Sequence, residues 1–193
     1  MNMRKNLKLL YSKYFRFINR SNAVIGIDCE FGFKARIINR TGRRENLVIG
    51  NNVMLHGTVI CEGNGRLLLN DYVNIRRDVY IGAVKNVEVG KYTIISNNVS
   101  IMDNDNHPTS PTLRLKMVKS GWSNNNWSWV NSASSSVTIA ENVWICQGVR
   151  ILKGCHIGEN SVIAAGAVVT KSVGDNSVCA GNPGKVVKVI NEK

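Results

Sequence analysis

Residues 139–174 read IAENVW-ICQGVR-ILKGCH-IGENSV-IAAGAV-VTKSVG, six hexapeptides in a row. Each hexapeptide begins with an aliphatic residue, and the residue four places later is small or β-branched. The leading residues are Ile139, Ile145, Ile151, Ile157, Ile163 and Val169, and the second set is Val143, Val149, Cys155, Ser161, Ala167 and Val173. If about a quarter of residues are aliphatic, six leading matches in a row arise by chance on the order of a few times in ten thousand. The period therefore reflects the fold.

A period of six fits neither the 3.6-residue period of a helix nor the alternation of a simple strand. It is typical of a solenoid in which three hexapeptides make one triangular coil, with the aliphatic residue pointing inward. The pattern also occurs earlier, with two small corner insertions, at the leading residues Ile49, Leu55, Leu69, Ile75, Ile81, Val89, Ile95 and Ile101. We therefore predict an all-β fold, a parallel β-helix of hexapeptide repeats over residues 23–190.

The composition suits one globular domain, with 44% hydrophobic and 20% charged residues among 193. No apolar run is long enough to cross a bilayer. Lys8, Lys13 and Arg16 interrupt the apolar residues that a signal peptide would need, so we expect a cytoplasmic protein. The five cysteines are scattered without a C-x-x-C pair, so we expect reduced thiols.

The net charge of +12 is unevenly distributed, because residues 1–20 contain six basic residues and no acid. Such a chain can favour nucleic acid, anionic lipid, an acidic polysaccharide or a phosphate-rich cofactor. The sequence shows no basic stripe with regularly interleaved aromatic residues, so we expect no nucleic-acid partner.

Residues 1–22 form a separate N-terminal segment in which residues 3–20 predict an amphipathic helix. Its apolar residues recur at helical spacing, at Leu7, Leu10, Tyr11, Tyr14, Phe15 and Ile18. This face either packs on the solenoid or a neighbouring subunit, or contacts the inner face of the membrane.

Residues 106–136 interrupt the repeat, and their composition changes to Pro, Ser, Asn and Trp. We expect a long inserted loop that projects outward, since a solenoid has no interior space for it. Trp122, Trp127 and Trp129 indicate that the loop packs between subunits or over a ligand.

His107 stands where the repeat stops, in the segment Asp103-Asn104-Asp105-Asn106-His107-Pro108. Pro108 favours an extended backbone at His107, and a nearby carboxylate can orient the imidazole. Asp105 is the first choice for that carboxylate and Asp103 the competing one. His56 and His156 fall at outward or corner positions, where a structural or solvated role is expected.

The segments IAENVWICQGV, IGENSVIAAGAVVTK and AGNPGKVVK resemble the left-handed β-helix acetyltransferases. The resemblance covers residues 45–190, and galactoside, maltose and capsular or exopolysaccharide O-acetyltransferases are the nearest relatives it suggests. It implies a left-handed β-helix, a homotrimer with each site between two subunits, acetyl-CoA as co-substrate and His107 as general base. The handedness rests on the resemblance alone, since parallel crossovers are generally right-handed.

The resemblance also implies the remaining site residues. The acetyl-CoA groove is assigned to Trp144, Gln147, Ala165, Thr170, Lys171, Lys185 and Lys188, and the acceptor pocket to Tyr72 and Asn74. Small residues at 164–166 leave room for a pantetheine arm, and lysines can meet phosphates as point charges. Two departures stand out: two basic positions that are arginine in the sugar enzymes are lysine here, and Ile81-Gly82-Ala83 stands near the position of an expected acceptor-binding aspartate.

We therefore expect an O-acetyltransferase that acts on a hydroxyl of a sugar, a surface polysaccharide or its precursor. An N-acetyltransferase for an amino sugar or amino acid, and a non-catalytic β-helix scaffold, are the alternatives. The γ-class carbonic anhydrases share this fold and bind a metal through three histidines, two of them closely spaced. The histidines here are 51 and 49 residues apart, so we expect no metal site.

Overall fold

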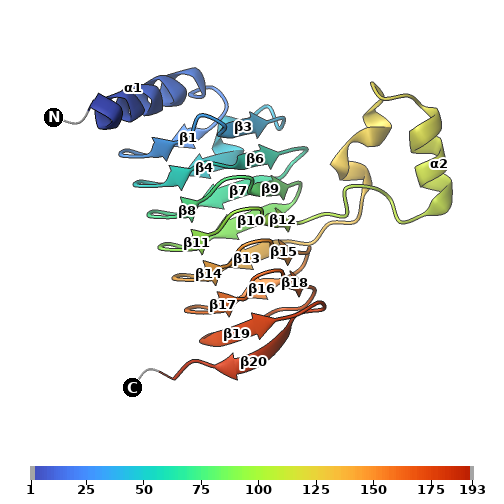
Figure 1. The fold of residues 1–193 in the computed structure, drawn as a ribbon. Helices are drawn as coiled ribbons and strands as arrows, with labels where there is room; N and C mark the ends of the chain where they lie inside the picture. Colours follow the sequence, from blue (N-terminus) through green and yellow to red (C-terminus); the bar gives the residue numbers. More distant parts are fainter. Residues whose placement is uncertain (1–2, 192–193) are drawn as a thin grey trace.

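The computed structural model describes residues 3–191 and shows a triangular solenoid with one helix at its N-terminal end (Figure 1). Three sheets, which we call A, B and C, run along the solenoid. Sheet A contains β1 (Val24–Ile25), β4 (Leu47–Ile49), β7 (Arg66–Leu69), β10 (Asn86–Val89), β13 (Val137–Ile139) and β16 (His156–Ile157). Sheet B contains β2 (Glu30–Phe31), β5 (Met54–Leu55), β8 (Asn74–Ile75), β11 (Ile94–Ile95), β14 (Trp144–Ile145), β17 (Val162–Ile163), β19 (Ser177–Ala180) and β20 (Lys185–Val189). Sheet C contains β3 (Arg36–Asn39), β6 (Thr58–Cys61), β9 (Tyr80–Ala83), β12 (Ser100–Met102), β15 (Arg150–Ile151) and β18 (Val168–Val169).

The register of the strands places each repeat directly over the next. Ile95 pairs with Ile75 on one side and with Ile145 on the other, and all three side chains are fully buried. Every named strand pair is parallel except β19 and β20, which are antiparallel. Each leading and second residue of the hexapeptides in 139–174 is at most 3% exposed, including Cys155. The inward positions predicted from the period are confirmed.

The corners of the triangle differ in length. We name them by the sheets that they join: the A–B, B–C and C–A corners. The C–A corner holds the 3-10 helix η1 (Arg44–Asn46), the connections 62–65 and 84–85, and the long insertion before β13. All insertions before residue 137 therefore lie at this corner, where extra residues leave the inward residues of the next strand in register. The B–C corner departs from the period once in the other direction, because the connection from Leu55 to Val59 is shorter than the equivalent connection from Ile75 to Ile81.

The insertion between β12 and β13 is anchored by hydrogen bonds between its two ends. Asp105 N donates to Ala133 O (3.1 Å), and Ser135 N donates to Asp103 O (2.8 Å). Between these ends the structure differs from the predicted loop, since it contains α2 (Pro111–Lys119), η2 (Asn125–Trp127) and η3 (Trp129–Asn131). Ser110 caps α2 and Pro111 occupies its first turn, two helix-start signals within the Pro- and Ser-rich stretch. Figure 1 shows the insertion projecting from the side of the solenoid, with α2 farthest out.

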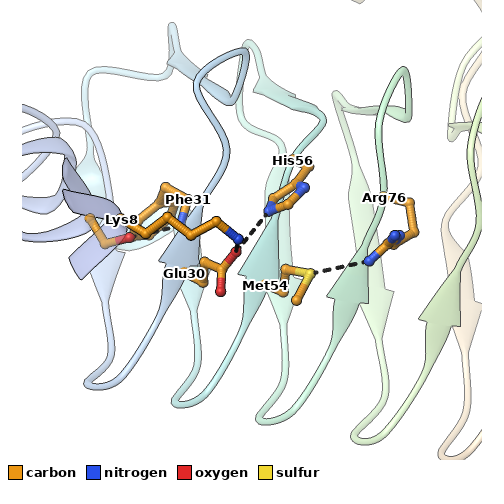
Figure 2. A network of polar contacts seen from close by, with 7 residues as sticks. Lys8, Glu30, Phe31, Met54, His56 and Arg76 are labelled. Atoms are coloured by element: carbon orange, nitrogen blue, oxygen red, sulfur yellow. Dashed lines mark hydrogen bonds and ion pairs between the residues drawn. The ribbon is translucent and has the colours of Figure 1, made fainter. Parts of the chain in front are cut away.

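The N-terminal helix α1 (Met3–Ile18) packs on the first coil, but not with the whole apolar face that the sequence indicated. Phe15 is buried against Phe31 (ring centroids 4.5 Å apart), and the Ser12 hydroxyl accepts a hydrogen bond from Phe31 N (3.1 Å). Lys8 and His56 both contact the Glu30 carboxylate at 3.3 Å (Figure 2). The apolar face of the helix is therefore divided, since only part of it packs on the coil. Four of its members remain exposed: Leu7, Leu10, Tyr14 and Ile18.

Within residues 3–191, no helix combines the length and the apolar character needed to cross a membrane.

Candidate active site

The segment that carries His107 begins with Asp103, whose carboxylate accepts hydrogen bonds from backbone N–H groups. Asp103 is inaccessible to solvent and accepts hydrogen bonds from the N–H groups of Val84, Lys85 and Asn86, at 2.7–3.1 Å. A buried carboxylate that satisfies three N–H groups is a strong structural tie. Asp103 therefore closes the preceding C–A connection and fixes the point from which the insertion leaves.

Asp105 holds the same segment through a different partner. Its carboxylate lies 2.6 Å from Lys153 Nζ, which belongs to the next coil at the C–A corner. Its carbonyl oxygen accepts a hydrogen bond from His107 N at 2.6 Å. Asp105 therefore positions His107 through the backbone, while its carboxylate is bound to Lys153.

The imidazole of His107 is exposed at the base of the insertion. Its ring meets the Trp127 ring edge-on, with centroids 5.8 Å apart and an interplanar angle of 87°. Trp127 in turn stacks on Trp122 at 4.4 Å. The aromatic residues near the end of the insertion therefore pack against the histidine at its beginning. Because His107 is exposed, a hydroxyl of a ligand can reach its imidazole from solvent.

Tyr72, Asn74 and Trp144 lie elsewhere, on the outer side of sheet B and its A–B corner. Ile94 pairs with both Asn74 and Trp144, so these two side chains share one face. Trp144 is half exposed and its Nε1 donates to Ser96 Oγ (3.4 Å). The Oδ1 atom of Asn74 is shielded from solvent and has no hydrogen-bond partner among the residues that the structure describes.

Tyr72 has an unusual backbone for its residue type. Its φ is 61°, and Tyr92 at the same corner of the next coil has a φ of 59°. Other coils place asparagine there, at Asn52, Asn142 and Asn160. Left-handed backbone is costly for a bulky side chain, and such outliers are found at functional sites. The two tyrosine rings stack at 5.3 Å and form an exposed aromatic surface beside Asn74.

The other residues assigned to the acetyl-CoA groove are exposed, at two different corners. Gln147 and Ala165 lie at the B–C corner beside Gly148 and Gly166, whose φ values are 74° and 71°. Lys185 and Lys188 lie on β20, the last strand of sheet B. Thr170 and Lys171 follow β18 at the C–A corner, the corner that also holds His107.

The predicted site residues therefore form two sets within one chain. His107, Asp105, Thr170 and Lys171 lie at the C–A corner, whereas the remaining ones lie on sheet B and at its corners. In a triangular solenoid, sheet B is the side opposite the C–A corner. One chain does not bring the two sets together.

The other histidines are bonded within the solenoid. The His56 ring contacts Glu30, and the His156 ring lies 2.7 Å from Thr138 Oγ1. Within the described part of the chain, no group of three His, Cys, Asp or Glu side chains is arranged to hold a metal ion.

The cysteine thiols are poor nucleophiles for a covalent mechanism. Burial raises the pKa of Cys61 to about 12, and burial also raises the pKa of Cys155 and Cys146. Nucleophilic attack requires the thiolate, so each of these thiols stays in its unreactive form at neutral pH.

A groove lies between the insertion and sheet C, a place that the repeat pattern did not predict. This groove of about 630 Å³ is lined by side chains of both, including Arg40, Tyr80, Trp127 and Trp129. Glu62, only 7% exposed, joins its walls, because its carboxylate accepts hydrogen bonds from Ser128 Oγ, Trp129 N (3.0 Å) and Arg40 Nη1 (3.2 Å). Tyr80 and Glu62 lie dozens of residues before the insertion in the sequence. They occupy outward or corner positions, and the hexapeptide period predicts only the inward ones.

The repeat also identifies the chain by comparison with known proteins. Residues 136–171 match the family described as bacterial transferase hexapeptide (six repeats). The chain belongs to the hexapeptide-repeat transferase family. Its fold, predicted as a left-handed parallel β-helix, is confirmed by solved structures of the same architecture.

Two curated relatives align with a large part of the chain. The chain is 41% identical over 104 residues to the galactoside O-acetyltransferase of Lactococcus lactis, which is 54% of this chain and 44% of that protein. It is 30% identical over 139 residues to a candidate lipopolysaccharide biosynthesis O-acetyl transferase of Escherichia coli, covering 68% of this chain and 64% of that protein. The chain spans about two thirds or less of the length of the first curated relatives that it matches.

Two solved structures of hexapeptide-repeat enzymes are similar over nearly the whole chain. A galactoside acetyltransferase in complex with coenzyme A is 28% identical, with a TM-score of 0.61, and the match covers 94% of this chain and 72% of that one. AntD, an N-acyltransferase from Bacillus cereus solved with coenzyme A and an amino sugar nucleotide, is 18% identical with a TM-score of 0.69, covering 92% and 89%. At that identity, the second likeness concerns the fold alone.

Proposed function

We propose that this protein is an O-acetyltransferase that moves the acetyl group of acetyl-CoA to a hydroxyl of a sugar, a surface polysaccharide or its precursor. The observation that carries the proposal is the placement of His107. It is exposed where the repeat stops, held through the backbone by Asp105 and walled by Trp127. The named relatives that act on galactosides and take part in lipopolysaccharide biosynthesis support the acceptor class. We place the reaction in the cytoplasm, where acetyl-CoA is available.

The reaction proceeds by direct transfer in a ternary complex. His107 takes the proton of the acceptor hydroxyl as its oxygen attacks the thioester carbonyl, and a backbone N–H can stabilise the tetrahedral oxyanion. The C–S bond then breaks, and the imidazolium returns its proton to the departing thiolate of coenzyme A. No covalent enzyme intermediate is required, consistent with the raised pKa of the cysteine thiols.

The B–C corner offers a surface that suits the pantetheine arm of coenzyme A. The Cβ position of Gly148 would meet only Gly166 backbone atoms, at 3.8 Å, and nothing lies within 4 Å of the Cβ position of Gly166. A flat corner of small residues lets an extended chain approach the backbone closely. Lys185 and Lys188 on neighbouring β20 can meet its phosphates as point charges.

We infer that a complete site needs two copies of the chain, as in a homotrimer. The C–A corner of one copy supplies His107, and sheet B of the next supplies Trp144 and the acceptor residues Tyr72 and Asn74. The outer side of α2 fits such an arrangement, because Leu113, Leu115 and Val118 are at least half exposed. A monomer at micromolar concentration would contradict this arrangement.

The test is a screen for thiol release from acetyl-CoA in the presence of sugars, nucleotide sugars and capsule fragments. We expect turnover with at least one hydroxyl acceptor, and His107→Ala should lower turnover at least about a hundredfold. His156→Ala is the matched control, because His156 is an exposed residue of strand β16 bonded to Thr138 and lies outside the proposed site. Activity of His107→Ala within a few-fold of the wild type would end the proposal of a histidine base.

Competition between hydroxyl and amino acceptors in the same assay separates O- from N-acetylation. If amino sugars are the better acceptors, the N-acetyltransferase alternative holds. If no acceptor releases thiol, the protein is a non-catalytic scaffold.

A further inference from the structure

We propose that the groove between the insertion and sheet C is a binding subsite for a pyranose unit of the acceptor glycan. This inference rests on the proposed function, since it gives the acceptor a binding site beyond the reacting sugar. The groove volume of about 630 Å³ lies within the usual range for small-molecule sites.

The lining of the groove combines aromatic rings with neutral amides. Tyr80, Trp127 and Trp129 all line it, and Tyr80 meets Trp129 edge-on at 6.2 Å. A pyranose ring has an apolar face of C–H groups and a rim of hydroxyls, so its face packs on an aromatic ring while its rim takes hydrogen bonds.

The amides of Asn124 and Asn131 each use one atom within the insertion. Asn124 Oδ1 accepts from Asn126 N (3.0 Å), and Asn131 Nδ2 donates to Asn125 O (2.8 Å). Their other amide atoms are the ones that can meet sugar hydroxyls, as both a donor and an acceptor.

The charge of the groove also favours a glycan over a highly charged ligand. Arg40 and Glu62 form an ion pair across the wall (3.2 Å), and Glu62 is further bonded to the insertion. Their charges offset each other locally, which leaves a neutral, rigid, aromatic surface.

Two contacts connect the groove to the reaction and to the fold. Trp127 lines the groove and contacts the His107 ring, so a glycan in the groove extends toward the proposed base. Trp129 packs on Gly82, where a Cβ would lie 2.9 Å from its ring. Gly82 stands near the position at which the sugar enzymes were expected to carry an acceptor-binding aspartate. Here the aromatic side chain of the insertion occupies that surface.

Tryptophan fluorescence titration without acetyl-CoA tests the subsite directly. The probes are maltohexaose, chitohexaose and hexagalacturonate. We expect saturable binding of at least one, weakened about fivefold or more in Tyr80→Ala, as expected for loss of an aromatic contact worth about 1 kcal/mol. No saturable binding of any probe, or equal binding by Tyr80→Ala, would overturn the inference.

Tyr14→Ala is the matched control, because Tyr14 is likewise a tyrosine and is 59% exposed, but lies on α1 and does not line the groove. It should change binding less than about twofold. His107→Ala should keep glycan binding, so loss of the base and loss of the subsite are distinguishable. If His107→Ala remains active while Tyr80→Ala loses binding, the proposed mechanism fails and the subsite stands.

A different observation, the exposed side of α1, carries a second inference. We infer that this side binds an anionic lipid surface. Leu7, Leu10, Tyr14, Phe17 and Ile18 follow one another at helical spacing and are each 47–63% exposed. Phe33, 70% exposed, packs on Tyr11 (4.7 Å) and continues the apolar surface onto the first coil.

We call the exposed apolar residues Leu7, Leu10, Tyr14, Phe17 and Ile18 the α1 stripe. The charges beside this stripe favour a lipid surface over a second copy of the chain as its partner. Lys13, Arg16 and Arg20 are exposed on the neighbouring flank, and the first acidic residue of the sequence is Asp28. Two or three such helices packed together would bring like charges close, whereas anionic headgroups attract Lys and Arg side chains. An apolar stripe flanked by basic residues is the pattern of an interfacial helix.

Co-sedimentation with vesicles of phosphatidylglycerol and phosphatidylethanolamine, and with vesicles of phosphatidylcholine, tests this inference. We expect binding to the anionic vesicles and a loss of at least about tenfold in a Leu10→Ser/Phe17→Ser variant, whose changes lie at exposed positions. Leu152→Ser/Val187→Ser, two exposed apolar positions outside α1, is the control and should bind like the wild type.

Absence of wild-type binding, or unchanged binding by the stripe variant, would overturn the inference. A change in the sedimentation coefficient of the stripe variant without lipid would also overturn it, since a second copy would then cover the stripe.

Discussion

The C–A and B–C corners belong to the same coils but are built in opposite ways. The B–C corner is short in each coil, and from the third coil onward it contains left-handed residues such as Asp78, Gly148 and Gly166. The C–A corner is widened four times before residue 137 and carries buried acids, Glu62 and Asp103, that bind the backbone.

This difference shows which part of the repeat is free to change. The inward residues are fully buried and fixed in register, so variation concentrates where the chain turns outside the core. A corner can stay short and leave a flat surface for a thin ligand, or it can hold an extra segment with its own aromatic groove. In this chain the B–C corner is of the first kind and the C–A corner is of the second.

The largest expected effect concerns the buried carboxylate that anchors the insertion. Asp103→Ala leaves three backbone N–H groups without their acceptor in a buried corner, and should lower the free energy of unfolding by about 3 kcal/mol or more. Urea denaturation at fixed protein concentration measures it. A loss below about 1 kcal/mol would mean that the insertion is not anchored through this side chain.

Gly82→Ala should destabilise by about 1–3 kcal/mol, because the new Cβ would lie 2.7 Å from the Met102 side chain and 2.9 Å from the Trp129 ring. Near-ultraviolet circular dichroism should change with it, since Trp129 is displaced. Gly174→Ala is the control, as nothing lies within 4 Å of its Cβ position. Equal spectra and equal stability for both variants would show that the insertion does not pack on sheet C at Gly82.

Gly166→Ala should cost about 1–2 kcal/mol, because φ is +71° although the space is open. The paired variant is Gly121→Ala in the insertion, where φ is +76° and the space is also open. Thermal unfolding should respond to Gly166→Ala and hardly to Gly121→Ala if the insertion opens independently of the solenoid. An equal shift for both would show that the insertion unfolds together with the coils.

The smallest effect is expected for Asp105→Ala. Its ion pair with Lys153 is partly exposed to solvent, so the stability should fall by about 1 kcal/mol or less, with less effect at high salt. Denaturation at two salt concentrations checks this. A loss as large as that of Asp103→Ala would contradict the different roles given to the two aspartates.

Much of the fold could be predicted because the residues of the core recur at every sixth position of the sequence. Ile145, Ile163 and Cys155 were placed inside from spacing alone, and the break in the repeat located the insertion and His107. The helix α2 and the groove partner Tyr80 were not predicted, because outward residues carry no periodic constraint. Similarly, helical spacing identified the apolar residues of α1 but not which of them, Phe15 rather than Leu10, meets the coil.

The amino-acid sequence by itself determined the solenoid, its inward residues and the place where the coils are interrupted, since burial of one aliphatic residue per hexapeptide is a local and repeating requirement. Only the tertiary structure decided how outward side chains are combined. It committed Asp103 to the backbone and Asp105 to Lys153, brought Trp127 to His107, and put Trp144 on the side opposite that corner. These contacts join residues from different coils and from the insertion, and such distances depend on how the whole chain packs.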